Sequence, residues 1–95
     1  MTKTEFDPKK DAVNRAKHGV PLDRAADFDW SDARIKPDAR RDYGEPRFIG
    51  TGWIGKRLYV MVFTRRGDVV RIINLRKANA RERKRHAQEE APPPH

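Results

Sequence analysis

Two arginines in a stretch of alternating side chains are the first candidates for chemistry. Residues 69–76 read Val-Val-Arg-Ile-Ile-Asn-Leu-Arg, which predicts a β-strand. An arginine in a paired strand must reach an edge, a carboxylate or an anionic ligand, because burying it unpaired is costly. With the basic residues that follow, Arg71 and Arg76 favour a phosphate-binding surface over side chains that simply extend to the rim of a sheet. Those basic residues are Lys77, Arg81, Arg83, Lys84 and Arg85.

Histidine is the second candidate, since it exchanges protons near neutral pH. His18 follows Lys17 at a predicted helix end, where it either caps the helix or serves in proton transfer and phosphate contact. His86 lies four residues from both Glu82 and Glu90, so pairing on a helix surface accounts for it equally well.

These residue types suit the cleavage of RNA without a metal ion. The ribose 2′-hydroxyl can attack the adjacent phosphate when a base, an acid and cations are present, and histidine, lysine and arginine can fill these roles. The acidic residues of the first half lack the pattern of a divalent-cation loop. Because the chain has no cysteine, disulfides, thiolate metal sites and cysteine nucleophiles are excluded. We therefore expect neither a metal site nor a cofactor.

The charge of the 95-residue chain is concentrated in its second half. Lys and Arg number 22 against 14 Asp and Glu, a net charge of +8. Residues 1–45 hold ten of each sign, whereas residues 46–95 hold twelve bases and four acids. A polyanion, first of all nucleic acid, is the expected partner. The sequence shows no membrane-length apolar run and no signal-peptide pattern, so we expect a cytoplasmic protein without membrane contact.

Helices are expected near both ends of the chain. Asp7-Pro8 begins a helix predicted over 8–18, which a glycine closes. A second short helix is predicted over 22–28. Asn79-Ala80-Arg81-Glu82 has the form of a capping box and begins a polar helix predicted over 80–90.

Between the helices the apolar pattern changes to a period of two. A bent strand is predicted over 47–53, and the strand over 58–64 is apolar on both faces, which is typical of a central strand. With 69–76 they form an antiparallel meander, to which residues 33–36 can add a short edge strand. We therefore predict an α+β fold with two N-terminal helices, a small antiparallel sheet and a C-terminal helix.

We expect these elements to form one domain over residues 1–90, followed by a disordered proline-rich tail over 91–95. The polar loop over 38–45 carries Tyr43, which we expect to contact a ligand by stacking. Tyr59, on the central strand, is expected in the core.

The sequence resembles the BrnT family of toxins over roughly residues 5–86. The N-terminal part of the resemblance consists of Phe6-Asp7-Pro8, Asn14, Lys17-His18-Gly19, Ala25-Ala26 and Phe28-Asp29. The C-terminal part runs from Arg71-Ile72-Ile73-Asn74-Leu75-Arg76 through Ala78 to Glu82-Arg83. The lysine–histidine–glycine helix end and the arginine-rich segment together are its most specific features.

This resemblance implies a toxin of a type II toxin–antitoxin pair with a RelE-like fold. It implies an endoribonuclease that blocks translation and arrests growth. It further implies a ribbon-helix-helix antitoxin, similar to BrnA, that neutralises the toxin by direct binding and takes the complex to operator DNA.

Functional positions of the family carry over where the residues match. The resemblance implies that Arg71, Arg76 and Arg83 contact phosphate and stabilise the transition state, with Lys17 and His18 as further catalytic candidates. The residues expected to bind RNA beside them are Lys77, Arg81, Lys84, Arg85 and His86.

Two positions depart from the family pattern. Asn74 stands where a serine is common, and His86 stands near the place of a frequent tyrosine. In a regular strand Arg71 and Arg76 point to opposite faces, so a bulge near Asn74, or a strand that ends before Arg76, is needed if both are to line one groove.

Two other interpretations stay open. One is a non-catalytic basic module that binds RNA or DNA, for which salt-sensitive binding without turnover is expected. The other is a degenerate toxin that acts only as a partner or co-repressor of its antitoxin. A neighbouring gene for a ribbon-helix-helix repressor would favour the toxin over both.

Overall fold

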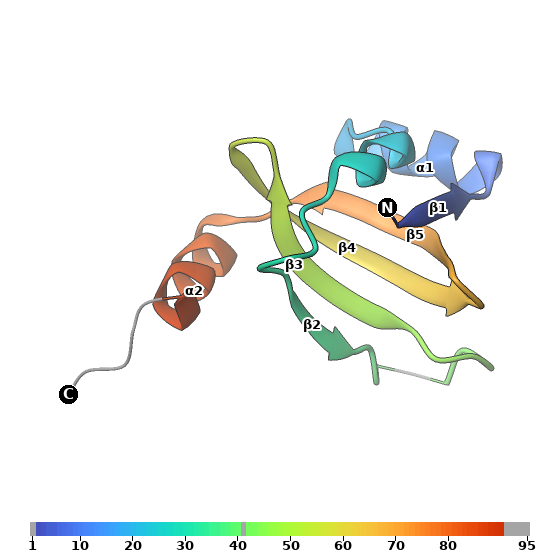
Figure 1. Cartoon of the computed structure of the whole chain (residues 1–95). Helices are drawn as coiled ribbons and strands as arrows, with labels where there is room; N and C mark the ends of the chain where they lie inside the picture. The colour runs from blue at the N-terminus through green and yellow to red at the C-terminus, as the bar shows by residue number, and fades with distance from the viewer. Residues whose placement is uncertain (1, 41, 91–95) are drawn as a thin grey trace.

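The computed structural model of the chain describes residues 2–40 and 42–90. Five strands form one sheet, in the order β1-β5-β4-β3-β2 (Figure 1). The elements are β1 (Lys3–Phe6), α1 (Pro8–His18), the 3₁₀ helix η1 (Leu22–Asp27), β2 (Arg34–Pro37), β3 (Phe48–Ile54), β4 (Arg57–Arg66), β5 (Val69–Lys77) and α2 (Ala80–Glu90). The predicted tail over 91–95 lies outside the described residues, and the single domain over 1–90 stays a prediction.

Helix α1 confirms the bounds predicted from the sequence. The side chain of Asp7 accepts a hydrogen bond of 2.9 Å from the backbone N–H of Lys9, and Pro8 occupies the first helical position. Gly19 ends the helix in the left-handed conformation, with φ 70°, and its N–H donates to the carbonyl of Arg15. This cap fixes the place of His18, the last residue of the helix.

Strand β4 lies at the centre of the sheet, between β3 and β5. Tyr59, Met61 and Phe63 point into the main core on one face, whereas Leu58 and Val60 pack into a smaller cluster on the other. The predictions of a central strand with two apolar faces and of a buried Tyr59 are therefore confirmed.

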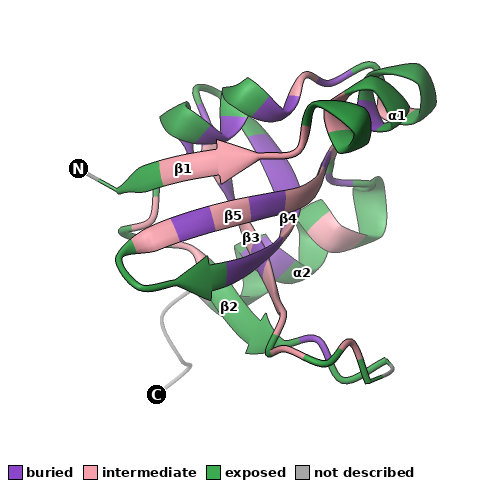
Figure 2. Cartoon of the chain, turned by 90° about the vertical axis from the view of Figure 1, so that its right-hand side faces the viewer, coloured by how far each residue is buried: buried purple, intermediate pink, exposed green. Residues whose placement is uncertain are grey.

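The main core fills the space between the sheet and the segment formed by α1 and η1. Buried and half-buried side chains alternate over the first part of β5, as expected for a strand with one covered face (Figure 2). Gly52 on β3 lets the ring of Phe28 lie directly against the backbone, because a Cβ atom there would be 2.6 Å from Cζ of that ring. A side chain at this position would force the ring of Phe28 or the backbone of β3 to shift.

Helix α2 lies away from α1 and covers one end of the opposite face of the sheet (Figure 1). Leu58, Val60 and Ala78 form the small buried cluster at this end. His86 of α2 packs edge-on against Trp53 of β3, with ring centroids 6.1 Å apart. Of the helices in the described part of the chain, none combines the length and the hydropathy needed to cross a membrane.

The prediction of a purely antiparallel sheet is wrong. Strands β3, β4 and β5 are antiparallel in chain order, and β2 adds a short antiparallel edge strand. Strand β1, however, lies parallel to β5 and makes the sheet mixed. Its four residues carry no clear alternation, and they become a strand because the outer edge of β5, distant in sequence, supplies hydrogen-bond partners.

The prediction of a second N-terminal α-helix over 22–28 is also wrong. Leu22–Asp27 form a 3₁₀ helix, in which Arg24 N–H donates to the carbonyl of Pro21 at 3.2 Å. The residue before this six-residue segment, Pro21, has no side chain that can cap it, and the N–H of Leu22 instead donates to Oδ1 of Asp11 on α1 at 2.8 Å. Burial of Leu22 and Ala25 in the core, rather than helical hydrogen bonding, sets its conformation.

Candidate functional site

A cleft of about 800 Å³ lies on the face of the sheet opposite the main core. Strands β3, β4 and β5 contribute its floor, and α1, α2, β2 and the loop after β2 contribute its walls. Of the described residues, seven bases and two carboxylates line it, so the cleft attracts anions. The bases are Lys17, Arg34, Lys36, Arg40, Arg47, Arg76 and Arg85, and the carboxylates are Glu82 and Glu89.

A bulge in β5 decides which side chains face the cleft. The register shifts between Val62 and Phe63 of β4, so that Ile73 has no directly opposite residue. Arg71 then lies opposite Thr64 and Arg76 opposite Val60, which share one face of β4. Of the two alternatives that would bring both arginines to one face, a bulge near Asn74 or an early end of the strand, the structure has the bulge.

Arg71 nevertheless lies outside the lining of the cleft. It is two positions before the bulged residue, and its guanidinium is 3.3 Å from the carboxylate of Glu5 on β1. Arg76 lies at the other end of β5, beside α2, and lines the cleft.

Asn14 holds the end of α1 against β5. Its side-chain amide donates to the carbonyls of Val20 and Leu75 at 2.8 and 2.7 Å, and its oxygen accepts from the N–H of Leu75 at 3.2 Å. The pairing of β1 with β5 ends at Ile72, so this side chain satisfies backbone groups of β5 beyond the end of β1. One consequence is that His18 lies over the bulge of β5.

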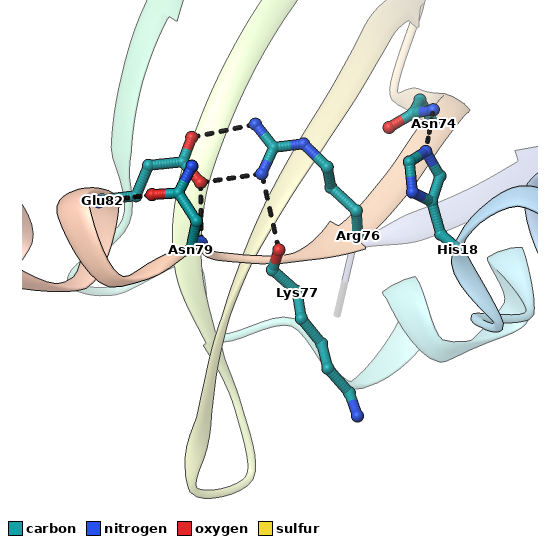
Figure 3. A network of polar contacts seen from close by, with 6 residues as sticks. All are labelled: His18, Asn74, Arg76, Lys77, Asn79 and Glu82. Atoms are coloured by element: carbon teal, nitrogen blue, oxygen red, sulfur yellow. Dashed lines mark hydrogen bonds and ion pairs between the residues drawn. The ribbon is translucent and has the colours of Figure 1, made fainter.

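His18 and Asn74 meet at the floor of the cleft (Figure 3). Nδ2 of Asn74 is 3.5 Å from Nε2 of His18, a long contact at the limit of hydrogen-bond distance. Partial burial lowers the pKa of His18 below 6.5, and the positive charges of Lys17 and Arg76 lower it further. Each of these effects favours the neutral imidazole, the form that can accept a proton.

Arg76 and Glu82 form a two-pronged ion pair beside this histidine (Figure 3). The guanidinium donates to Oε1 at 2.7 Å and to Oε2 at 2.9 Å. This pairing raises the pKa of Arg76, against the effects of burial and of the charge of Arg40. It also lowers the pKa of Glu82, so the pair stays charged.

The same glutamate begins helix α2, as the capping box predicts. Glu82 N–H donates to Oδ1 of Asn79 at 2.8 Å, and Asn79 N–H donates to Oε1 of Glu82 at 2.9 Å. The capping box is confirmed, and it links the start of α2 to the guanidinium of Arg76. Among the described residues, no group of three or more His, Asp or Glu side chains is placed to hold a metal ion.

A family model described as the ribonuclease toxin BrnT of type II toxin–antitoxin systems matches residues 6–82 of the 95-residue chain. The chain belongs to the BrnT family. A search of curated proteins gives no match. As a BrnT-family member the chain is a ribonuclease toxin of a type II pair, and an antitoxin is its partner. The matched segment contains all four residues of the cluster formed by His18, Asn74, Arg76 and Glu82.

The structure brings together some of the predicted site residues and separates others. Of the catalytic candidates, Lys17, His18 and Arg76 line the cleft, whereas Arg71 and Arg83 do not. Of the residues expected to bind RNA, Arg85 and His86 line the cleft. The others, Lys77, Arg81 and Lys84, are exposed and lie outside its lining.

His86 is buried, at 3 % exposure, and does not lie on the exposed surface of the helix. Its contact with Trp53 attaches the middle of α2 to the sheet. Nearby, Arg85 pairs with Glu89 at 3.3 Å along the same helix.

Other residues of the cleft were not predicted as site residues. Glu82 carried a signal, because the capping box marks it, but its link to Arg76 needs the turn between β5 and α2. The bases of β2 and of the following loop carried none, since basic residues in polar segments are usually only solvated. They are Arg34, Lys36, Arg40 and Arg47.

Proposed function

We propose that this BrnT-family toxin is an endoribonuclease that works without a metal ion, with Lys17, His18 and Arg76 as its catalytic centre. The position of His18 carries the proposal. An imidazole whose lowered pKa favours the neutral form, next to an arginine held by a carboxylate, lies in a cleft of about 800 Å³ that is lined mainly by bases. A base and a cation in one anion-attracting cleft are what phosphodiester cleavage by a 2′-hydroxyl needs.

In the proposed reaction, His18 accepts the proton of a ribose 2′-hydroxyl as its oxygen attacks the adjacent phosphorus. The bond between phosphorus and the 5′-oxygen breaks, and the ammonium group of Lys17 gives this oxygen a proton. The products are a 2′,3′-cyclic phosphate and a 5′-hydroxyl end. Arg76 stabilises the charge that builds up on the phosphoryl oxygens.

Arg76 can do this while it remains paired with Glu82. A guanidinium has five N–H donors, of which the ion pair uses two and a 3.4 Å contact with the carbonyl of Lys77 a third. We therefore assign Glu82 as a positioning residue that keeps the guanidinium plane directed along the cleft. Arg71 and Arg83 lie outside the cleft, and their role is to attract RNA by charge together with the exposed bases near α2.

The proposed cellular role rests on membership of the family. Cleavage of RNA would block translation and arrest growth. A ribbon-helix-helix antitoxin would neutralise the toxin by direct binding, and the complex would reach operator DNA through that antitoxin. A basic cleft open on one face of the sheet supports capture by either RNA or a protein with acidic side chains.

Expression of the toxin alone, followed by cleavage assays with purified protein in EDTA, tests this function. We expect growth arrest and RNA cleavage with the wild-type chain, and a loss of cleavage of at least about 100-fold for Arg76→Ala. Arg65→Ala is the matched control, because Arg65 is exposed and pairs with Val70 on the face of the main core. RNA that stays intact while growth still stops would refute the ribonuclease proposal, and salt-sensitive binding without cleavage would favour a binding module.

A further inference from the structure

The loop between β2 and β3 carries a second positively charged group in the cleft. It is built on Asp38, whose side chain is fully buried. The guanidinium of Arg40 donates to both of its oxygens, at 2.7 and 2.8 Å, and the hydroxyl of Tyr43 donates at 3.1 Å. These bonds, above all those from Arg40, hold the pKa of Asp38 well below its usual range, so the loop is fastened by a permanent charge.

Arg47 lies at the end of this loop, next to β3, and contacts an aromatic ring. Its guanidinium carbon is 4.0 Å from the centre of the Tyr43 ring, a cation–π contact. In residues 2–40 and 42–90, no carboxylate forms an ion pair with it, and its buried Nε has no hydrogen-bond acceptor. The charge of Arg40 is matched by Asp38, whereas the charge of Arg47 is matched by no described carboxylate.

We infer that Arg47, stacked on Tyr43, is a phosphate subsite that binds the backbone of single-stranded RNA several nucleotides away from the bond that is cut. A stacked guanidinium keeps its N–H groups in one plane, the geometry that binds two phosphate oxygens together. A phosphate in the cleft would accept from the terminal N–H groups of this guanidinium, since Arg47 lines the cleft. This inference rests on the proposed ribonuclease function and extends it to substrate length.

The distance to the catalytic centre follows from the strand register. Arg76 lies opposite Val60, and Arg47 directly precedes Phe48, which pairs with Phe63. Two strand spacings and about four residues along a strand separate Arg47 from Arg76, or about 16 Å between backbone positions. Up to about five stacked nucleotides, or fewer extended ones, cover this distance. Arg40 and Arg47 line the same cleft as Arg76, so the loop and the proposed catalytic centre face one continuous space.

Binding of two RNA lengths to the full chain tests the subsite. The probes are an octanucleotide and a dinucleotide of uridine, with 2′-O-methyl groups that prevent cleavage. Octanucleotide binding is followed by fluorescence anisotropy, and dinucleotide binding by the imidazole NMR signals of His18. We expect Arg47→Gln to weaken the octanucleotide about ten-fold and to leave the dinucleotide within about two-fold.

The salt dependence separates a phosphate contact from a general loss of structure. Affinity for a single strand falls with salt, and removal of one phosphate contact makes the plot of log affinity against log salt less steep by about 0.7. We expect this decrease for Arg47→Gln. Arg47→Lys keeps the charge and the slope but recovers only part of the affinity, because it lacks the planar fork. Arg65→Gln, the control on the other face, should change neither affinity nor slope, and thermal melts confirm that each variant is folded.

Each contrary result has its own meaning. Unchanged octanucleotide binding by Arg47→Gln would refute the subsite but not the ribonuclease proposal. Equal weakening of the octanucleotide and the dinucleotide would also refute the subsite, because it would place Arg47 in the catalytic centre. A loss of antitoxin affinity without any loss of octanucleotide affinity would also overturn it, since the loop would then be a protein-docking surface. A wild-type chain that binds neither probe would refute the ribonuclease proposal together with the subsite.

Discussion

Replacement of Asn14 by alanine should destabilise the protein more than any change on the exposed side of α1. The Asn14 side chain is 3 % exposed and makes three hydrogen bonds to the backbone, one with Val20 and two with Leu75. At about 1 kcal/mol for each bond, Asn14→Ala should cost about 3 kcal/mol of unfolding free energy. For a chain of this size, this corresponds to a decrease of roughly 15 °C in Tm.

Thermal and urea unfolding followed by circular dichroism would measure this loss. Asn14→Leu separates hydrogen bonding from volume, since leucine fills similar space but leaves the same backbone groups unpaired. It should therefore be at least as unstable as Asn14→Ala. The exposed Val13, at 65 %, supplies the control Val13→Ala, which should stay within about 0.5 kcal/mol of wild type. A stable Asn14→Leu variant, within about 1 kcal/mol of wild type, would contradict this account of how α1 is held to β5.

Three further predictions concern the core, the ion pair and the histidine. Gly52→Ala should lower stability by about 1–3 kcal/mol, because its Cβ would lie 2.6 Å from the ring of Phe28; denaturation that matches wild type would show that the ring can move freely. Glu82→Gln should lower kcat by roughly ten- to hundred-fold, because Arg76 loses its alignment. KM should not rise, because the cleft loses a negative charge that repels RNA. A higher KM at unchanged kcat would contradict the positioning role. The pKa of His18 measured by NMR should lie below 6.5 and rise toward it in Arg76→Ala, because a positive charge that opposes protonation is removed; a value that does not move would disprove the coupling. If His18 is the base, kcat/KM of the wild type should fall as the pH drops through this pKa and reach a plateau above it.

Features fixed by neighbours in the chain could be predicted from the sequence. The helix over 8–18 has a capping residue, a proline and a terminal glycine, and each acts through contacts within a few residues. The capping box at Asn79 is equally local. The central strand was predictable because apolar residues on both of its faces suit burial from two sides.

Features that depend on distant partners could not be predicted. Strand β1 forms because β5 offers an open edge, and no pattern within Lys3–Phe6 announces it. Helix η1 is 3₁₀ because the core needs Leu22 and Ala25 in place, which outweighs the weak helical preference of its residues.

The candidate site could be predicted only in part, because contacts between residues distant in the sequence assemble it. Sequence placed Lys17, His18 and Arg76 among the candidates but could not show that Asn14 brings α1 to the bulge of β5. Net charge pointed to the second half of the chain, yet four of the bases that line the cleft come from the charge-balanced first half. They are Lys17, Arg34, Lys36 and Arg40. Folding, rather than local charge density, gathers them at one cleft.

The chemical nature of the cut ends tests the central claim most directly. A short RNA of defined sequence, incubated with purified wild-type protein in EDTA, should give fragments that end in a 2′,3′-cyclic phosphate and begin with a 5′-hydroxyl. A single 2′-deoxy substitution at the cut position should abolish cleavage there, because the attacking oxygen is gone. Cleavage that persists at the deoxy position, or that leaves 3′-hydroxyl and 5′-phosphate ends, would contradict attack by the 2′-hydroxyl with His18 as its base.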